Sequence, residues 1–113
     1  MKVTVTNDHP GEGQFPTFAK GTPVTMGEEC THYINWCACE IEGHKTYIAK
    51  CFVENGALNR DYDPTELIQK AGDILEVKEI VHAWLLATNK AGTIGWIPAE
   101  VVVSAKDRQS KNP

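Results

Sequence analysis

Four cysteines and two histidines in the first half of the chain are the residues best suited to chemistry. Cys37 and Cys39 lie two positions apart, and residues with this spacing on a β-strand point to the same side. Their thiolates could share one metal ion, with further ligands drawn from Cys30, His32, His44 and Cys51. Only one residue separates Cys37 from Cys39, whereas zinc ligands are usually separated by two to four residues. The alternative is that Cys37 and Cys39 are small apolar core residues. Because all the cysteines lie in one half, we expect free thiols, no structural disulfide and no metal.

Catalysis is not expected from these residues. A cysteine nucleophile needs a base and a group that orients the base, and Cys30 with His32 has no evident third partner. The sequence contains no Gly-x-Ser-x-Gly motif, phosphate-binding loop or paired-carboxylate motif. We therefore predict a protein that is not an enzyme and carries no cofactor, with a metal-binding or thiol-redox protein as the alternative.

The elements that must position these residues follow an internal repeat. Residues 16–53 align with residues 67–102 at an offset that drifts between 48 and 51 positions. The alignment places Gly21 under Gly72, Trp36 under Trp84, and Gly43 under Gly92. A period near 50 residues indicates duplication of one folding unit. We predict one unit over 1–53, a second over 57–104, a short linker over 54–56 and a disordered tail over 105–113.

Alternating apolar residues between turn signals predict short β-strands in both units. In the first unit they cover 3–6, 22–26, 36–41, 45–48 and 51–53, and in the second 57–58, 74–80, 84–88, 93–97 and 101–103. Five short strands with tight turns are typical of a small barrel. We predict an all-β chain of two five-stranded barrels, tightly docked because the linker is too short for a flexible tether.

Composition excludes several classes of partner. The net charge is −4 and no basic stripe occurs, so we expect no nucleic acid. The N-terminal segment lacks the apolar core of a secretory signal, and no stretch is long enough to span a membrane. We expect a cytoplasmic protein without membrane contact.

The second repeat resembles a Src-homology-3 domain. Ala57-Leu58 begins the opening motif of that family, and Gly72-Asp73-Ile74-Leu75 matches the start of the strand after its acidic loop. Trp84 stands at the first position of the family's tryptophan pair, and Gly95-Trp96-Ile97-Pro98 matches its closing segment. The resemblance implies tandem SH3-like barrels of the bacterial type, with the first repeat assigned through the second.

The family binds proline-rich peptides in the polyproline II form on a shallow groove of aromatic rings. The resemblance therefore implies a protein or peptide partner and a groove built from Trp84, Pro98 and Tyr62 in the second unit and Trp36 and Phe52 in the first. The acidic loop, with Asp61 and Asp63, pairs with a basic ligand residue in the family; the alternative is that it is simply solvated.

Each unit keeps only half of this groove, because Val101 and Ala49 replace a groove Tyr and a groove Pro of the family. A structural domain whose aromatic surface packs in a larger assembly is therefore a further alternative. The ligand and the oligomeric state stay open at this point.

Overall fold

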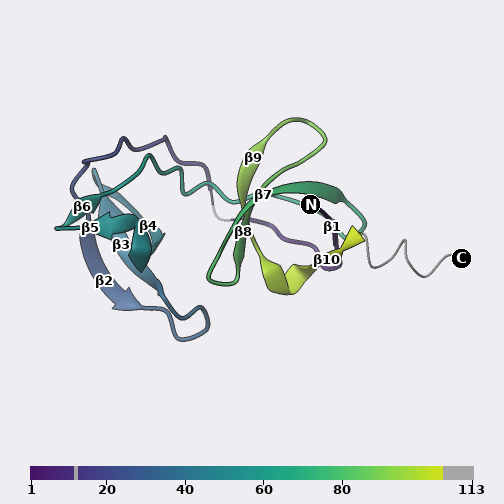
Figure 1. Ribbon diagram of the computed structural model, residues 1–113, viewed down its shortest axis with the longest axis horizontal. Helices are drawn as coiled ribbons and strands as arrows, with labels where there is room; N and C mark the ends of the chain where they lie inside the picture. Colours follow the sequence, from purple (N-terminus) through teal and green to yellow (C-terminus); the bar gives the residue numbers. More distant parts are fainter. Residues whose placement is uncertain (12, 106–113) are drawn as a thin grey trace, which may run out of the picture. The chain divides into compact units, whose positions relative to one another are not determined.

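The computed structural model describes residues 1–11 and 13–105, and β-strands dominate its ordered elements. The all-β prediction is therefore confirmed. The chain divides into two compact units (Figure 1). Unit 1 combines Met1–Gly13 with the chain from Thr65 onward, and unit 2 is Gln14–Pro64. Unit 2 is thus continuous in sequence, whereas unit 1 is built from two separate segments.

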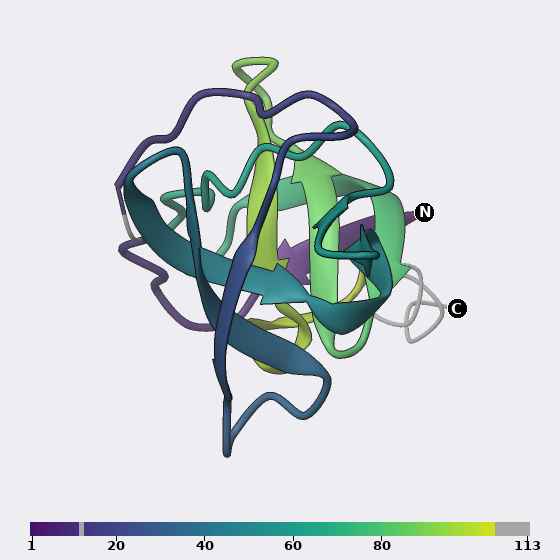
Figure 2. The same ribbon diagram turned by 90° about the vertical axis from the view of Figure 1, so that its left-hand side faces the viewer.

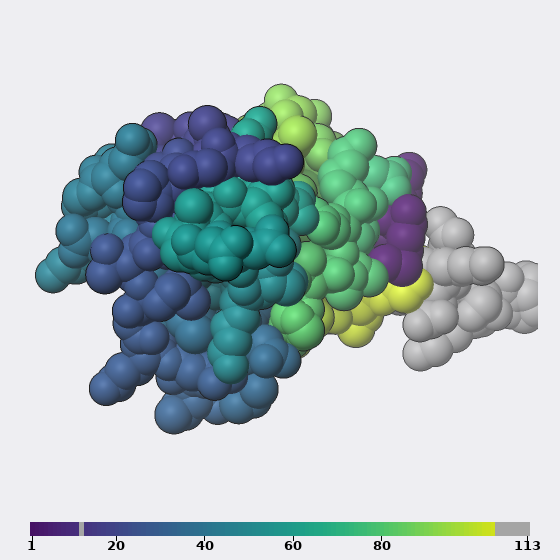
Figure 3. All heavy atoms as spheres, turned by 60° about the vertical axis from the view of Figure 1, so that its left-hand side comes forward, coloured from purple at the N-terminus to yellow at the C-terminus, as the bar shows by residue number. Residues whose placement is uncertain are grey.

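Unit 1 contains a five-stranded antiparallel sheet with the order β10-β1-β7-β8-β9. Its strands are β1 (Lys2–Val5), β7 (Ile74–Val81), β8 (Trp84–Thr88), β9 (Ile94–Pro98) and β10 (Val102–Ser104), with the 3₁₀-helix η2 (Ala99–Val101) before β10. Figure 3 shows the purple atoms of the N-terminal segment beside green and yellow atoms of the second half of the chain. The first strand of the sequence is therefore an inner strand of a sheet that the second half otherwise builds.

Unit 2 contains a three-stranded antiparallel sheet with the order β2-β3-β4 and a two-stranded sheet of β5 and β6. The strands are β2 (Thr25–Glu29), β3 (Trp36–Ile41), β4 (His44–Ala49), β5 (Val53–Glu54) and β6 (Ala57–Leu58), and the 3₁₀-helix η1 (Lys50–Phe52) precedes β5. Figure 2 shows the three-stranded sheet in blue to teal. The predicted linker over 54–56 is wrong, because Asn55 and Gly56 form the turn between β5 and β6, with φ of 53° and 77°.

The predicted unit boundaries also differ from the observed ones. β1 was expected in the first unit but pairs with β7 and β10, and β6 was expected in the second unit but pairs with β5. A period-2 pattern marks where a strand lies but not which strand it pairs with. Both units have open sheets rather than closed barrels. The predicted tail falls on residues outside those the structure describes, except for the buried Ala105.

The same backbone hydrogen bonds occur in both units at corresponding places. In unit 2 the N–H of Phe18 donates to Tyr62 at 2.8 Å and the N–H of Tyr62 returns a bond of 2.9 Å. In unit 1 the N–H of His9 donates to Gln69 at 2.8 Å and the N–H of Gln69 returns one of 2.9 Å. Likewise, the N–H of Gly21 donates to Leu58, and the N–H of Gly72 donates to Val5. Each unit therefore pairs the opening segment of one half with the main segment of the other.

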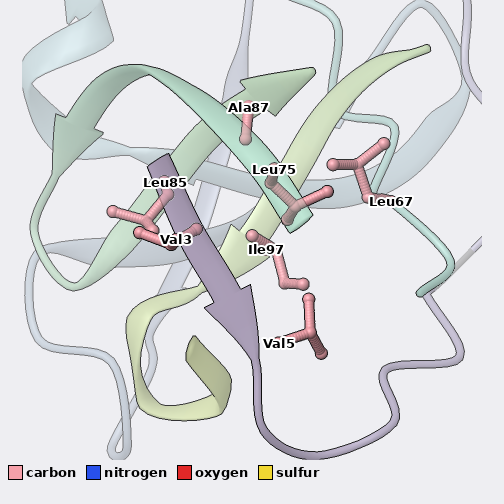
Figure 4. Packing of buried hydrophobic residues seen from close by; sticks show 7 residues of the cluster. All are labelled: Val3, Val5, Leu67, Leu75, Leu85, Ala87 and Ile97. Carbon is pink, nitrogen blue, oxygen red and sulfur yellow. The ribbon is translucent and has the colours of Figure 1, made fainter. Parts of the chain in front are cut away.

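The core of unit 1 is a single aliphatic cluster (Figure 4). It consists of Val3, Val5, Leu67, Leu75, Leu85, Ala87 and Ile97. Both opening-strand valines belong to it, and Ile97 and Ala87 are fully inaccessible. Ile97, from the segment that resembles the family's closing motif, is therefore a core residue. Burial of these side chains holds β1 in its sheet, at about 1.5–3 kcal/mol for each large aliphatic residue.

The two-residue turn between β7 and β8 stores backbone strain. His82 and Ala83 have φ of 42° and 71°, in the left-handed region that costs an L-residue about 1 kcal/mol. We expect Ala83→Gly to raise the free energy of unfolding by about 0.5–1 kcal/mol, because glycine adopts this conformation without a steric penalty. Chemical denaturation measures the change. The control is Ala87→Gly within β8, which should lower stability; a loss of stability in Ala83→Gly would contradict the argument.

Candidate functional site

Two of the cysteines are core residues of unit 2. Cys37 and Cys39 lie on β3 and are 4% and 6% exposed, and Cys37 pairs with the inaccessible Ile48 of β4. Burial, together with the neighbouring Cys37, raises the pKa of the Cys39 thiol to about 11. The Cys39 thiol therefore stays protonated at neutral pH, and both residues pack as small apolar side chains.

The remaining candidate ligands do not join them. All four cysteines are free thiols, Cys30 half-buried and Cys51 exposed. His44 instead packs its ring edge against Phe15 and Phe18, with centroid distances of 6.0 and 5.5 Å. Over residues 1–11 and 13–105, no group of three or more His, Cys, Asp or Glu side chains is arranged to hold a metal ion.

The thiols should differ strongly in reactivity. Cys51 is exposed and should react with an aromatic disulfide reagent in the folded protein, whereas the buried Cys37 and Cys39 should react at least about tenfold more slowly. Denaturation should equalise the rates. Cys51→Ser is the control and should remove the fast phase. A Cys39 that reacts as fast as Cys51 in the native protein would show that β3 is not packed as described.

Three of the four predicted groove rings are core residues of unit 2. Trp36, Phe52 and Tyr62 are only 3–4% exposed. Phe52 contacts the other two rings, with centroid distances of 6.3 Å to Trp36 and 5.4 Å to Tyr62. The Tyr62 hydroxyl donates to the Tyr47 carbonyl at 2.6 Å. The prediction that these rings line an exposed groove is wrong, because the segment that carries Tyr62 folds into unit 2 and against β4.

The two predicted acidic residues also lie in unit 2. Asp61 is exposed, and its Oδ1 accepts the Lys20 N–H at 2.8 Å. The corresponding bond in unit 1 joins Asp8 Oδ1 to the Ala71 N–H at 2.8 Å. Asp61 therefore fixes a turn, and Asp63 beside it is half-buried. Neither lies in the unit that carries Trp84.

Trp84 opens β8 in unit 1 and is partly exposed. It pairs across the sheet with the buried Pro98, so the structure brings these two predicted site residues together. The His9 ring packs edge-on against the Trp84 indole, with centroids 6.1 Å apart. His9 Nδ1 donates to the Leu67 carbonyl at 2.8 Å, and Nε2 lies 3.2 Å from Glu66 Oε1. Trp84, His9 and Glu66 form one group, called the Trp84 cluster below.

His9 and Glu66 were not predicted as site residues. His9 holds in unit 1 the backbone position that Tyr62 holds in unit 2, since each forms a two-way bridge to the loop of its unit. A signal for this was present, because Asp8-His9-Pro10 and Asp61-Tyr62-Asp63-Pro64 share an aspartate followed by a ring. The partner of each segment, however, lies in the other half of the chain.

A shallow pocket of about 310 Å³ lies elsewhere in unit 1, beside the turn between β8 and β9. On its wall the buried Gln69 donates through Nε2 to Asp73 at 2.7 Å and accepts the Asn89 amide at 2.9 Å. Asn89 Oδ1 in turn accepts the N–H groups of Ala91 and Thr93, both at 3.0 Å. This network satisfies its own polar groups and fixes the turn, which is a structural role.

Comparison of the chain with protein-family models, curated proteins and solved structures finds no match. Within the part of the chain that the structure describes, no helix is long and apolar enough to cross a membrane. The geometry of the Trp84 cluster is therefore the basis for assigning a function.

Proposed function

We propose that this chain is a non-catalytic protein-interaction module built from two degenerate SH3-like units, and that it binds a protein partner in the cytoplasm. The five antiparallel strands of unit 1 support this, with η2 directly after the Gly95-Trp96-Ile97-Pro98 segment that resembles the family's closing motif. The matched hydrogen bonds of unit 2 support a common origin of the two units.

The recognition surface of this proposal is the Trp84 cluster. The observation that carries it is that Trp84 is the one ring of the predicted groove that is partly exposed and not part of the core. A partly exposed tryptophan is a typical anchor of a protein interface, and its flat face packs well on proline rings. The Glu66 carboxylate, which lies 3.2 Å from His9 Nε2, offers a charged hydrogen bond to a basic ligand residue. The ligand class is therefore an extended, proline-rich peptide with a basic residue.

Substitution of Trp84 tests this assignment. Amide shifts of the ¹⁵N-labelled chain are followed during titration with a pool of proline-rich peptides, each made with and without an arginine. Trp84→Ala should weaken binding of the responding peptide about 30-fold or more, because an anchor contributes about 2 kcal/mol. Its effect on stability should be modest, since the ring is already partly exposed.

Ile97→Ala is the matched control in the same unit. Ile97 is fully buried, so this change should destabilise unit 1 by about 2–5 kcal/mol. If Trp84→Ala unfolds the unit as severely, Trp84 is a core residue and the proposal fails. If Trp84→Ala binds as tightly as the wild type, the recognition surface lies elsewhere.

The two alternatives have their own tests. Stoichiometric zinc in the purified protein, with loss of structure on chelation, would favour a metal-binding function over an interaction module. A molecular mass that rises with concentration, without any response to peptides, would favour a structural assembly domain.

A further inference from the structure

β4 in unit 2 and β9 in unit 1 are edge strands at corresponding places in their sheets. The Lys50 N–H after β4 donates to the Asn35 carbonyl at 2.9 Å, as the Ala99 N–H after β9 donates to Ala83 at 2.8 Å. β4 pairs with β3 through Ala38 opposite Tyr47, and β9 pairs with β8 through Leu86 opposite Trp96. Tyr47 and Trp96 therefore hold the same position, three residues before these bonds.

At this position the backbone faces the open side of the sheet. In an antiparallel pair, the N–H and C=O groups of alternate residues point away from the neighbouring strand. The Lys50 N–H donates to Asn35, the residue before β3, so alternation places the N–H and C=O groups of Tyr47 and Lys45 on the free edge of β4. The Tyr47 carbonyl shows this directly, because it accepts a hydrogen bond from the Tyr62 hydroxyl and not from a backbone N–H of β3.

In unit 1 the protein fills this edge with its own chain. The Trp96 N–H donates to Thr65 at 3.0 Å, and the Leu67 N–H donates to the Trp96 carbonyl at 2.9 Å. Glu66 thereby forms a parallel bridge with Trp96, which is only 3% exposed. Packing is so close that a Cβ on Gly95 would lie 3.0 Å from the Thr65 carbonyl oxygen. A three-residue extended segment thus closes the β9 edge.

In unit 2 no backbone segment of the described residues fills the matching edge, where the Tyr62 hydroxyl alone bonds to the Tyr47 carbonyl. Pro16 stands where Leu67 stands in unit 1, and proline has no N–H to donate. No acceptor for the Tyr47 N–H lies within the described residues, and Tyr47 is 45% exposed. Lys45 is also exposed and forms no ion pair within that part of the chain. The edge therefore offers the Tyr47 N–H, an accessible ring and a positive charge.

We propose that the β4 edge of unit 2 binds an extended, acidic segment of a partner protein by β-strand addition. The backbone of the segment bonds to Tyr47 and Lys45, an aliphatic side chain packs on the Tyr47 ring, and a carboxylate pairs with Lys45. The segment that fills the matching edge of unit 1, Thr65-Glu66-Leu67, has this composition. This surface lies in unit 2 and is independent of the Trp84 cluster.

The probe for the test is a synthetic peptide with the sequence of residues 63–69, DPTELIQ. It is titrated to millimolar concentration into the ¹⁵N-labelled full-length chain. The expected result is a saturable shift of the Lys45 and Tyr47 amides, with at least tenfold slower hydrogen exchange at Tyr47 and no change at Trp96. No response at Tyr47, or shifts centred on Trp96, would overturn the proposal.

Two changes remove the backbone pairing separately. Tyr47→Pro deletes an N–H that has no acceptor among the described residues, and proline is tolerated at such edge positions, so binding should fall at least tenfold while the sheet remains. Tyr47→Val keeps the N–H and should retain binding to within about threefold. A peptide N-methylated at alternate residues needs no change in the protein and should not bind. Equal binding of the methylated and unmodified peptides would contradict strand addition.

Charge and self-association complete the test. Lys45→Glu should weaken binding of the acidic peptide by about fivefold or more, and should not weaken a peptide in which glutamine replaces the glutamate. Sedimentation of the chain without peptide tests whether a second copy of the chain binds the β4 edge. Dimerisation that Tyr47→Pro abolishes would show that a second copy of this chain, and not a partner protein, takes the edge.

Discussion

Val5→Asp should unfold unit 1 and leave unit 2 folded. Val5 lies in β1, is 1% exposed and belongs to the core cluster of unit 1. A carboxylate at this position would lose its hydration without gaining a partner, and the aliphatic contacts would be lost as well. We expect unit 1 to lose more than about 4 kcal/mol, which is most of the stability of a small domain.

Amide hydrogen exchange distinguishes the two units in this variant. The amides of β7, β8 and β9 should lose protection, and those of β3 and β4 should keep it, although β1 precedes β3 in the sequence. The control is Val103→Asp on β10, where the side chain is 43% exposed and the change should stay within about 0.5 kcal/mol. Selective loss of β3 and β4 in Val5→Asp would instead support the unit boundaries predicted from the sequence.

The strands themselves could be predicted well from the sequence. The predicted strands over 36–41 and 84–88 coincide with β3 and β8, and the turn at Gly43 separates β3 from β4. These features depend on local information, namely alternation of apolar residues and the positive φ that Gly43 adopts at 83°. The signal was weaker for β2, which was predicted over 22–26 and lies at Thr25–Glu29, although its partner β3 follows directly along the chain.

The exchange of opening strands could not be predicted from such signals. The segments with Val3 and Val5 and with Ala57 and Leu58 are both short and apolar, and both main segments offer an equivalent place for them. Periodicity is the same for either pairing, so the choice rests on long-range packing and on the short turn at Asn55 and Gly56.

The same limit explains the site residues. Trp84 could be proposed from the sequence because its alignment with Trp36 and its place between the Gly72-Asp73 and Gly95-Trp96 segments are properties of the sequence. The burial of Trp36, Phe52 and Tyr62 is a property of the assembled unit and has no local pattern. The contact of His9 with Glu66 and Leu67 joins residues far apart in the sequence. It could be found only once it was known that the opening strand of each half pairs with the main segment of the other half.

Ile48→Asp in unit 2 should, in contrast, lower the free energy of unfolding of both units. Ile48 lies on β4, is fully buried and pairs with Cys37, so unit 2 should lose more than about 4 kcal/mol. Unit 2 is also an insertion between Gly13 and Thr65 of unit 1. While it is folded, the bridge between Phe18 and Tyr62 holds its two ends together. Once unfolded, it becomes a flexible loop that unit 1 must close.

The cost of that closure sets the expected effect on unit 1. For a loop of about 50 residues the entropic term is on the order of 3 kcal/mol, and unit 1 should be destabilised by roughly this amount without any change in its own contacts. Amide hydrogen exchange in β7 and β8 of the Ile48→Asp variant measures this loss of stability. Ile34→Asp is the matched control, because Ile34 lies in the same unit, is 61% exposed and should leave both units unchanged. Unaltered exchange at β7 and β8 in a variant whose β3 and β4 amides are unprotected would show that unit 1 does not depend on unit 2 for closure.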